Sequence, residues 1–128
     1  MNILDNLLYT KSHEWVLFTS EDTCTVGISD YAQSAMGDIV FINLPVVGDS
    51  LVAGEALCDL ESVKAVADVF SPVSGIVEAV NDSLDDAPEA LNAEPYTAWI
   101  AQISGAARTA ELMDADAYRE LLESEGHI

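Results

Sequence analysis

A short internal repeat constrains the fold of this chain more than any other feature of its sequence. Residues 47–51 (VGDSL) recur as residues 80–84 (VNDSL), and residues 53–57 (AGEAL) are echoed by residues 87–91 (APEAL) with one residue inserted between the segments. Similar segments in the same order indicate one structural unit that is used twice. Two strand–turn–strand halves of this kind predict two small antiparallel sheets related by an approximate twofold axis and packed around one core.

The segment between the two copies is predicted to be a hairpin with Lys64 at its tip. Residues 57–61 and 66–70 have the composition of strands and would form the arms, which leaves residues 62–65 (SVKA) for the turn. The turn contains no glycine, so a type I turn is favoured over a primed turn, whose central residues need a positive φ. Lys64 would then lie at one end of the two-sheet sandwich.

Apolar and alternating segments predict further strands along the chain. A strand pair with a turn is expected over residues 8–18, and single strands are expected over residues 23–28, 38–44, 75–80 and 96–103.

Two segments are typical of helices. Asp30 as N-cap, Gln33 three residues later and Gly37 beyond predict a short internal helix. Asp114 is the candidate N-cap of a terminal helix that ends before Gly126, with apolar residues at helical spacing between them. The expected class is therefore α+β and mainly β. We expect the 128 residues to form one domain, 1–128, with a helical tail at about 110–126 and a core that needs no metal or disulfide.

The charge balance restricts the partners of the chain. Four lysines and arginines stand against 23 acidic residues, a net charge of −19. Such a surface repels phosphate backbones and anionic lipids, so we expect neither nucleic acid nor membrane binding. Two interpretations stay open at this point: the acids steer the domain toward basic patches on other proteins, or they only keep it in solution.

The N-terminal residues, the cysteines and the histidines show no targeting segment, reactive thiol pair or metal-binding motif. Residues 1–5 (MNILD) have neither a secretory signal nor the arginines of a transit peptide, so we expect a bacterial cytoplasmic protein, or a mitochondrial matrix protein only if a transit peptide has been removed. Cys24 and Cys58 lie in apolar runs and are expected to be buried and unreactive. His13 and His127 have no neighbours at ligand spacing, so we expect no metal site.

Lys64 is the only basic residue between Lys11 and Arg108, and three roles compete for it. The first is an ordinary solvated lysine on a turn. The second is a catalytic amine that forms a Schiff base, which needs an uncharged amine; the nearby acids Asp59, Glu61 and Asp68 oppose this. The third is covalent modification by a separate enzyme, which the acids do not obstruct because that enzyme supplies the activated acyl group. We favour modification.

Several blocks of the sequence resemble the glycine cleavage system H-proteins. Residues 61–65 (ESVKA) followed by residues 71–75 (SPVSG) are similar to the lipoyl-attachment region of that family. Further similar blocks follow the family order: residues 9–15 (YTKSHEW), 26–33 (VGISDYAQ), 37–41 (GDIVF), 80–81 (VN), 88–92 (PEALN) and 95–96 (PY). The resemblance covers nearly the whole chain. One departure is that residues 97–98 lead directly to Trp99, one residue less than the family pattern.

The resemblance implies a non-catalytic carrier with a lipoyl/biotinyl-type barrel-sandwich fold. Lys64 would carry one lipoic acid in amide linkage, attached by a lipoate ligase or a lipoyl/octanoyl transferase. The arm would take the aminomethyl group of glycine from a pyridoxal-phosphate glycine decarboxylase (P-protein) to a tetrahydrofolate-dependent aminomethyltransferase (T-protein). Dihydrolipoamide dehydrogenase (L-protein) would then reoxidise the dithiol. A monomer is expected.

The resemblance also implies roles for individual residues around the lysine and in a cleft that shelters the arm from water. Residues expected to mark the hairpin for the modifying enzyme are Glu61, Ser62, Val63 and Ala65. Residues expected to make polar contacts with the arm are Ser12, Glu14 and Asp68, whereas Trp15 is expected in the core.

Other carriers share the hairpin and remain as alternatives. A biotin carrier usually has methionines beside its lysine, where this chain has Val63 and Ala65. A lipoyl module of an oxo-acid dehydrogenase would lack the block at residues 9–15 and the terminal helix. A donor in a lipoyl relay would have the same sequence as a glycine cleavage carrier. An acidic interaction protein would need no modified lysine.

Overall fold

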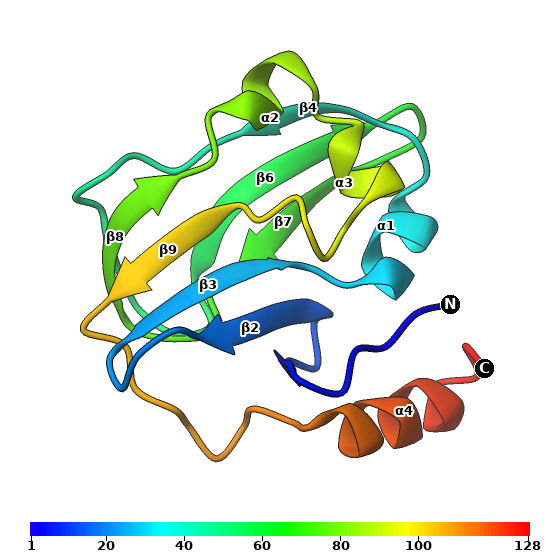
Figure 1. Cartoon of the computed structure of the whole chain (residues 1–128). Helices are drawn as coiled ribbons and strands as arrows, with labels where there is room; N and C mark the ends of the chain where they lie inside the picture. Colours follow the sequence, from blue (N-terminus) through cyan, green and yellow to red (C-terminus); the bar gives the residue numbers. More distant parts are fainter.

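The computed structural model describes all residues of the chain, 1–128, as two antiparallel sheets and four helices, arranged as Figure 1 shows. The strands are β1 (Leu8–Tyr9), β2 (Glu14–Phe18), β3 (Thr23–Ile28), β4 (Ile39–Asn43), β5 (Ser50–Leu51), β6 (Ala56–Ser62), β7 (Val66–Phe70), β8 (Gly75–Val80) and β9 (Ala101–Ser104). The helices are α1 (Asp30–Met36), α2 (Ser83–Asp86), α3 (Ala90–Ala93) and α4 (Ala115–Ser124). The expected mainly β class with an internal and a terminal helix is confirmed.

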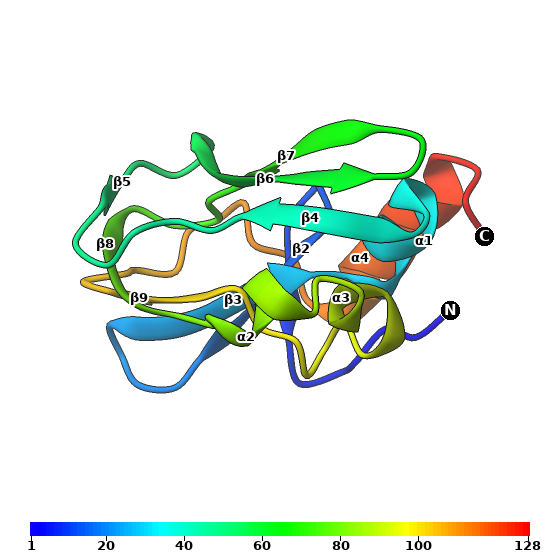
Figure 2. The ribbon, with the colours of Figure 1, turned by 90° about the horizontal axis from the view of Figure 1, so that it is seen from above.

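The two sheets differ in size and lie as two layers. The larger sheet has the strand order β1-β2-β3-β9-β8-β5, and the smaller has the order β4-β6-β7. Seen from above, β4, β6 and β7 form one layer, and β2, β3, β8 and β9 form the other (Figure 2). The main core is a cluster of 20 buried residues from both sheets and from the loops between them. Alternating side chains place one face of each sheet against this core.

The hairpin expected around Lys64 is confirmed. Strands β6 and β7 pair in antiparallel register, and the backbone N–H of Ser62 donates to the carbonyl of Ala65 at 2.8 Å. His13 is the only non-glycine residue of the chain with positive φ, so the turn after β6 is not of the primed kind, as its composition predicted.

The two copies of the repeat have different local structures. The first leads through a turn, with Gly48 at φ 98°, into β5. The second runs from the end of β8 into helix α2, where Leu84 is buried in the main core. The prediction of a second strand–turn–strand unit over residues 80–91 is therefore wrong. Asn81 explains part of the difference, because its side chain bonds Ser83 and the carbonyl of Trp99 and starts the helix instead of a strand.

Two further boundaries are corrected. Ser29, not Asp30, caps α1, since its Oγ accepts the backbone N–H of Ala32 at 3.2 Å. The carboxylate of Asp30 instead accepts hydrogen bonds from Asn2 and Gln33. The last strand begins at Ala101 instead of residue 96, because the N–H groups of residues 97 and 98 bond the carbonyl of residue 94 in a turn that follows α3.

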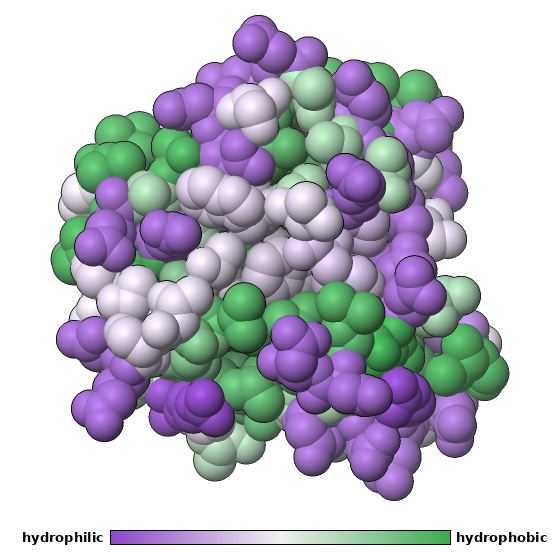
Figure 3. Space-filling model, in the orientation of Figure 1, coloured by the Kyte–Doolittle hydropathy of each residue, from purple (hydrophilic) through white to green (hydrophobic).

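Helix α4 packs against the outer side of the larger sheet over a second, smaller core. The Oδ1 of Asp114 accepts the N–H of Ala117 at 2.9 Å, which confirms Asp114 as the N-cap. Buried residues of this core are Leu7, Tyr9, Trp15, Ala115, Tyr118 and Leu122. Hydrophilic residues cover the lower edge of the molecule where α4 lies (Figure 3). None of the helices has the length and apolar character needed to cross a membrane.

Candidate functional site

Lys64 is exposed in the turn between β6 and β7, at the end of the smaller sheet. The Oγ of Ser62 accepts the N–H groups of Lys64 at 3.3 Å and Ala65 at 3.0 Å, and this fixes the turn. The aliphatic part of the lysine crosses over Gly37, where a Cβ would lie 3.1 Å from Lys64 Cε. The turn therefore presents an amine on an ordered backbone.

The residues that flank Lys64 divide into contacts inside the turn and exposed side chains. Ser62 is used for the turn itself, whereas Glu61, Val63 and Ala65 are exposed. Val63 is 71% exposed, and its N–H donates to the carbonyl of Asp38 at 3.0 Å. The backbone of the turn is thus tied to the segment between α1 and β4, while its side chains remain free for contact.

A cleft of about 320 Å³ opens beside the last residue of β7. Its walls come from four parts of the chain: the turn between β1 and β2, the turn before β6, the end of β7 and the segment before α4. The lining residues are Thr10, Lys11, Ser12, Glu14, Ala53, Gly54, Phe70, Ser71, Pro72, Glu111, Leu112 and Met113. Ser12 and Glu14, both predicted from the sequence, are brought together here.

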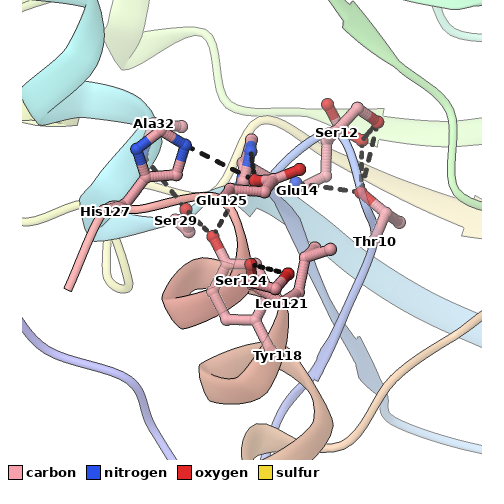
Figure 4. Close-up of polar contacts among 11 residues, drawn as sticks. Thr10, Ser12, Glu14, Ser29, Ala32, Tyr118, Leu121, Ser124, Glu125 and His127 are labelled. Atoms are coloured by element: carbon pink, nitrogen blue, oxygen red, sulfur yellow. Dashed lines mark hydrogen bonds and ion pairs between the residues drawn. The ribbon is translucent and has the colours of Figure 1, made fainter.

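Glu14 is the chemically distinctive group of the cleft. It is only 3% exposed, and its Oε1 accepts the hydroxyls of Thr10 and Ser12, each at 2.6 Å (Figure 4). Its Oε2 accepts the N–H of Phe70 at 3.4 Å. Burial raises the pKa of the Glu14 carboxyl, and the hydrogen bonds from Ser12, Thr10 and Phe70 partly offset this effect.

No cation of the chain pairs with Glu14. The ion pairs of the structure involve only His13, Arg119 and His127, none of them with this carboxylate. A buried carboxylate without a positive partner is unfavourable for the fold unless hydrogen bonds compensate for it. The arrangement therefore provides a place where a small ammonium group would be bound more strongly than in water.

The turn that carries Ser12 and Glu14 is held from the side of α4. His13 has φ 75°, and its Nδ1 lies 2.9 Å from the hydroxyl of Tyr118. The same hydroxyl lies 2.7 Å from Ser29 Oγ (Figure 4). The ring of His13 packs against Tyr31 with centroids 4.6 Å apart. Because the backbone of His13 is left-handed, its ring reaches α4 while the residues on either side line the cleft.

Other predicted residues lie outside the cleft. Asp68 is exposed on β7, two residues before Phe70, and its role as a contact stays a prediction. Trp15 is 3% exposed and donates from Nε1 to the carbonyl of Pro95 at 2.9 Å, so its expected place in the core is confirmed. Cys24 and Cys58 are buried and unpaired as expected, and burial raises the pKa of each thiol to about 12.

Some residues of the site were missed from the sequence. Thr10 has no distinct signal in the sequence, because residues 10–14 are all polar and the turn between β1 and β2 decides which of them line the cleft. The wall formed by residues 111–113 has none either, because it depends on an isolated bridge between Tyr9 and Met113, which are far apart in the sequence.

The fold and the site define a small two-sheet carrier-type domain that presents one lysine on a hairpin whose second strand ends at a sheltered cleft. The family model described as "Glycine cleavage H-protein" matches residues 7–125. The chain therefore belongs to the glycine cleavage H-protein family, the lipoyl carriers of the glycine cleavage system.

Relatives from bacteria and archaea agree with this assignment. The chain is 49% identical over 125 residues to the glycine cleavage system H protein of Lachnoclostridium phytofermentans, with 98% of each chain covered. It is 49% identical over 125 residues to the probable glycine cleavage system H protein of Pyrococcus abyssi, covering 95% of this chain and 93% of the relative. The crystal structure of a glycine cleavage system H protein from Mycobacterium marinum superposes with a TM-score of 0.85 at 34% identity, covering 97% of this chain and 99% of that one.

Proposed function

We propose that Lys64 carries a lipoyl group in amide linkage and that the protein moves the aminomethyl group of glycine between enzymes without catalysing a reaction itself. The partners are the glycine decarboxylase, the aminomethyltransferase and dihydrolipoamide dehydrogenase, together with a lipoate ligase or a lipoyl/octanoyl transferase. The setting is the bacterial cytoplasm. A lipoyl group supplies a disulfide that accepts a group and two electrons and is later reoxidised by thiol–disulfide exchange.

The observation that carries the proposal is the pairing of an exposed lysine with a buried, unpaired carboxylate in a cleft along the same strand. Strand β7 leads from the turn of Lys64 to Phe70 in the cleft wall. Lys64 is exposed and free of ion pairs, so that an enzyme can reach its amine. Glu14 in the cleft supplies a negative charge for an aminomethyl nitrogen, and the walls limit its contact with water.

Different residues that line the cleft would have different roles. The hydroxyls of Thr10 and Ser12 hold the Glu14 carboxylate in one orientation. Phe70, Leu112 and Met113 supply apolar wall that suits the hydrocarbon part of a lipoyl arm. Asp68, on the exposed side of β7, would meet the arm on its way from Lys64.

Intact mass measurement tests the attachment. The native chain, Lys64→Arg and Lys11→Arg are each incubated with a lipoate ligase, ATP and lipoate. The expected result is one lipoyl-sized increment on the native chain and on Lys11→Arg, and none on Lys64→Arg. Lys11 is the matched control because it is the only other lysine of the chain and it is also exposed.

A second assay separates glycine cleavage from a lipoyl relay. The lipoylated protein is mixed with glycine decarboxylase, glycine and labelled bicarbonate, and exchange of label into glycine is followed. A carrier of the glycine cleavage system supports this exchange. Lipoylation at Lys64 without any exchange would contradict the proposed function and favour the relay.

A further inference from the structure

An exposed apolar surface surrounds the lysine turn. We call it the tip surface and define it by Val40 and Phe41 of β4, Val63 of the turn and Val66 of β7. These side chains are 55%, 49%, 71% and 69% exposed, respectively. In register, Phe41 lies opposite Glu61 on β6, and Glu61 lies opposite Val66, so the residues form one row across the outer face of the smaller sheet.

A bulge in β4 enlarges this surface. Ile39 pairs with Ser62 and Phe41 pairs with Glu61, so Val40 is an extra residue in the β4 ladder. As a result Val40 and Phe41 both face solvent, whereas regular alternation would turn one of them inward. Two neighbouring apolar side chains are thereby exposed at the end of the strand nearest to Lys64. Contiguous exposed apolar side chains with a polar rim are typical of interaction sites.

The rim of the tip surface is acidic. Glu61 lies within the apolar row, Asp38 begins the segment that bonds the turn, and Asp59 pairs with Asp68 in the next row of the sheet. A second copy of this chain, with its net charge of −19, would bring like charges together on such a contact. The surface therefore fits a partner with an apolar patch and a basic rim.

We propose that the tip surface is the docking site of the enzyme that acylates Lys64. An enzyme that forms the amide must bring its acyl carbon within bonding distance of Lys64 Nζ, so it has to touch the side chains next to that amine. For an enzyme that acts on the far end of the finished arm, the reacting atoms lie many bonds away from Nζ, so its chemistry does not itself require contact with the tip surface. This inference rests on the proposed lipoylation of Lys64 and adds β4 and Val66 to the residues that mark the hairpin.

The reaction at this surface is an acyl transfer. The Nζ of Lys64 forms a C–N bond to the acyl carbon of an acyl adenylate or an acyl thioester, and the bond from that carbon to AMP or to the thiol sulfur breaks. The Lys64 ammonium loses two of its three protons, to solvent or to the departing thiolate, and the third stays on the amide nitrogen. No oxidant or reductant is needed. The tip surface contributes binding and orientation only, so its loss should raise KM more than it lowers kcat.

Steady-state acylation of two double variants tests the proposal. The double variant Phe41→Thr/Val66→Thr replaces the apolar side chains of the row on the two edge strands, β4 and β7. The double variant Val46→Thr/Val47→Thr is the matched control. Val46 and Val47 are 65% and 57% exposed and follow the other end of β4. With lipoate ligase, ATP and lipoate, we expect kcat/KM to fall about 30-fold for the first pair, mostly through KM, and to change less than about twofold for the control.

Thermal unfolding, acylation of a third variant and acylation of the native chain separate a failed inference from misfolding and from a failed proposed function. Thermal unfolding of both double variants should match the native chain because the replaced side chains are exposed; Val63→Thr, in the turn, provides a further test outside the strands. Equal kcat/KM for both double variants and for Val63→Thr would overturn the inference while leaving lipoylation of the native chain intact. If no chain is acylated, the proposed function fails instead.

Two other partners could bind the tip surface, the decarboxylase or a second copy of this chain, and each would give a different experimental result. Fully lipoylated Phe41→Thr/Val66→Thr should support glycine–bicarbonate exchange at the native rate; a large loss there with normal acylation would assign the surface to the decarboxylase and overturn the inference. A native dimer that this double variant converts to a monomer in sedimentation velocity would assign it to a second copy and also overturn it.

Discussion

Replacing Glu14 by glutamine should raise the stability of the fold at neutral pH and weaken the binding of an ammonium group in the cleft. The two side chains have nearly the same shape, so the cleft keeps its walls. Glutamine can accept the N–H of Phe70 at its carbonyl and donate its amide hydrogens to the hydroxyls of Thr10 and Ser12, which now accept. What the substitution removes is a negative charge that is 3% exposed and has no cationic partner.

The sign of the stability change follows from the pKa. Burial raises the pKa of the Glu14 carboxyl above its value in the unfolded chain, about 4.3, so ionisation is less favourable in the folded state. The native chain therefore loses stability relative to Glu14→Gln as the pH rises from about 4 to above the folded pKa. At pH 7.5 the variant should melt higher, by about 3–6 °C for each kcal/mol in a chain of this size. Below pH 4 the difference should disappear.

The effect on the cleft follows from hydrogen-bond strength. A hydrogen bond to a charged group contributes about 1.5–3 kcal/mol and a neutral one about 0.5–1.5 kcal/mol, so the loss is about 1–2 kcal/mol, or roughly 5- to 30-fold in occupancy. An aminomethyl nitrogen that leaves the cleft is exposed to water. After loading by glycine decarboxylase and glycine, the lipoylated variant should thus release ammonia about tenfold faster than the native protein.

The assay pairs differential scanning calorimetry at pH 7.5 and 4.0 with ammonia release at pH 7.5. Glu111→Gln is the matched control, because it removes the same charge from an exposed position on the cleft wall and should change neither quantity appreciably. A lower melting temperature for Glu14→Gln at pH 7.5, or unchanged ammonia release, would refute the reasoning about the buried carboxylate.

Three further predictions concern the scaffold of the site. Asp114→Ala removes the cap of α4 and should cost about 1 kcal/mol in urea unfolding, whereas Asp116→Ala, in the same turn but without a capping bond, should cost less than half of that. Gly27→Ala would place a Cβ 2.6 Å from the ring of Trp15 and should cost about 1–3 kcal/mol; an unchanged unfolding midpoint would contradict the close packing of β2 on β3. Burial lowers the pKa of His13, so as the pH falls the unfolded chain takes up a proton at this residue before the folded chain does. The contribution of neutral His13 to the free energy of unfolding should be full above about pH 6.5 and should be lost as the pH falls toward the folded pKa. His13→Asn should therefore lose less stability than the native chain between pH 7.5 and 5.5, and an equal loss in both would exclude His13 as the cause.

Local patterns predicted those elements whose residues decide their own conformation. The strand over Thr23–Ile28 alternates between polar and apolar residues in the sequence and is found with the expected bounds, although every residue from Cys24 to Ile28 is buried. The hairpin arms and Gly37 as the end of α1 were also predicted, because a strand pattern and a residue at φ 77° act within a few positions. The family blocks, which extend over most of the chain, pointed to Lys64 and to three polar contacts, Ser12, Glu14 and Asp68, of which the first two line the cleft.

The errors occurred where distant contacts outweigh local pattern. The repeat has nearly the same residues in both copies, yet the second becomes α2 because Asn81 bonds the carbonyl of Trp99 and Leu84 enters the main core. Tyr96 and its neighbours have strand-like composition, but the hydroxyl of Tyr96 bonds the backbone of Asn2, and the chain turns before β9. Neither contact can be read from nearby sequence.

The sequence by itself determined which residue to consider for modification: Lys64 is isolated among acids, lies between the predicted arms of a hairpin and has family blocks on both sides. The tertiary structure decided what surrounds it. Only folding removes Glu14 from water and brings Phe70 and Met113 beside it, and only the bulge in β4 turns Val40 and Phe41 outward together. Burial and register depend on strands that are distant in the sequence, so the charge environment of the cleft and the surface around the lysine are properties of the folded chain.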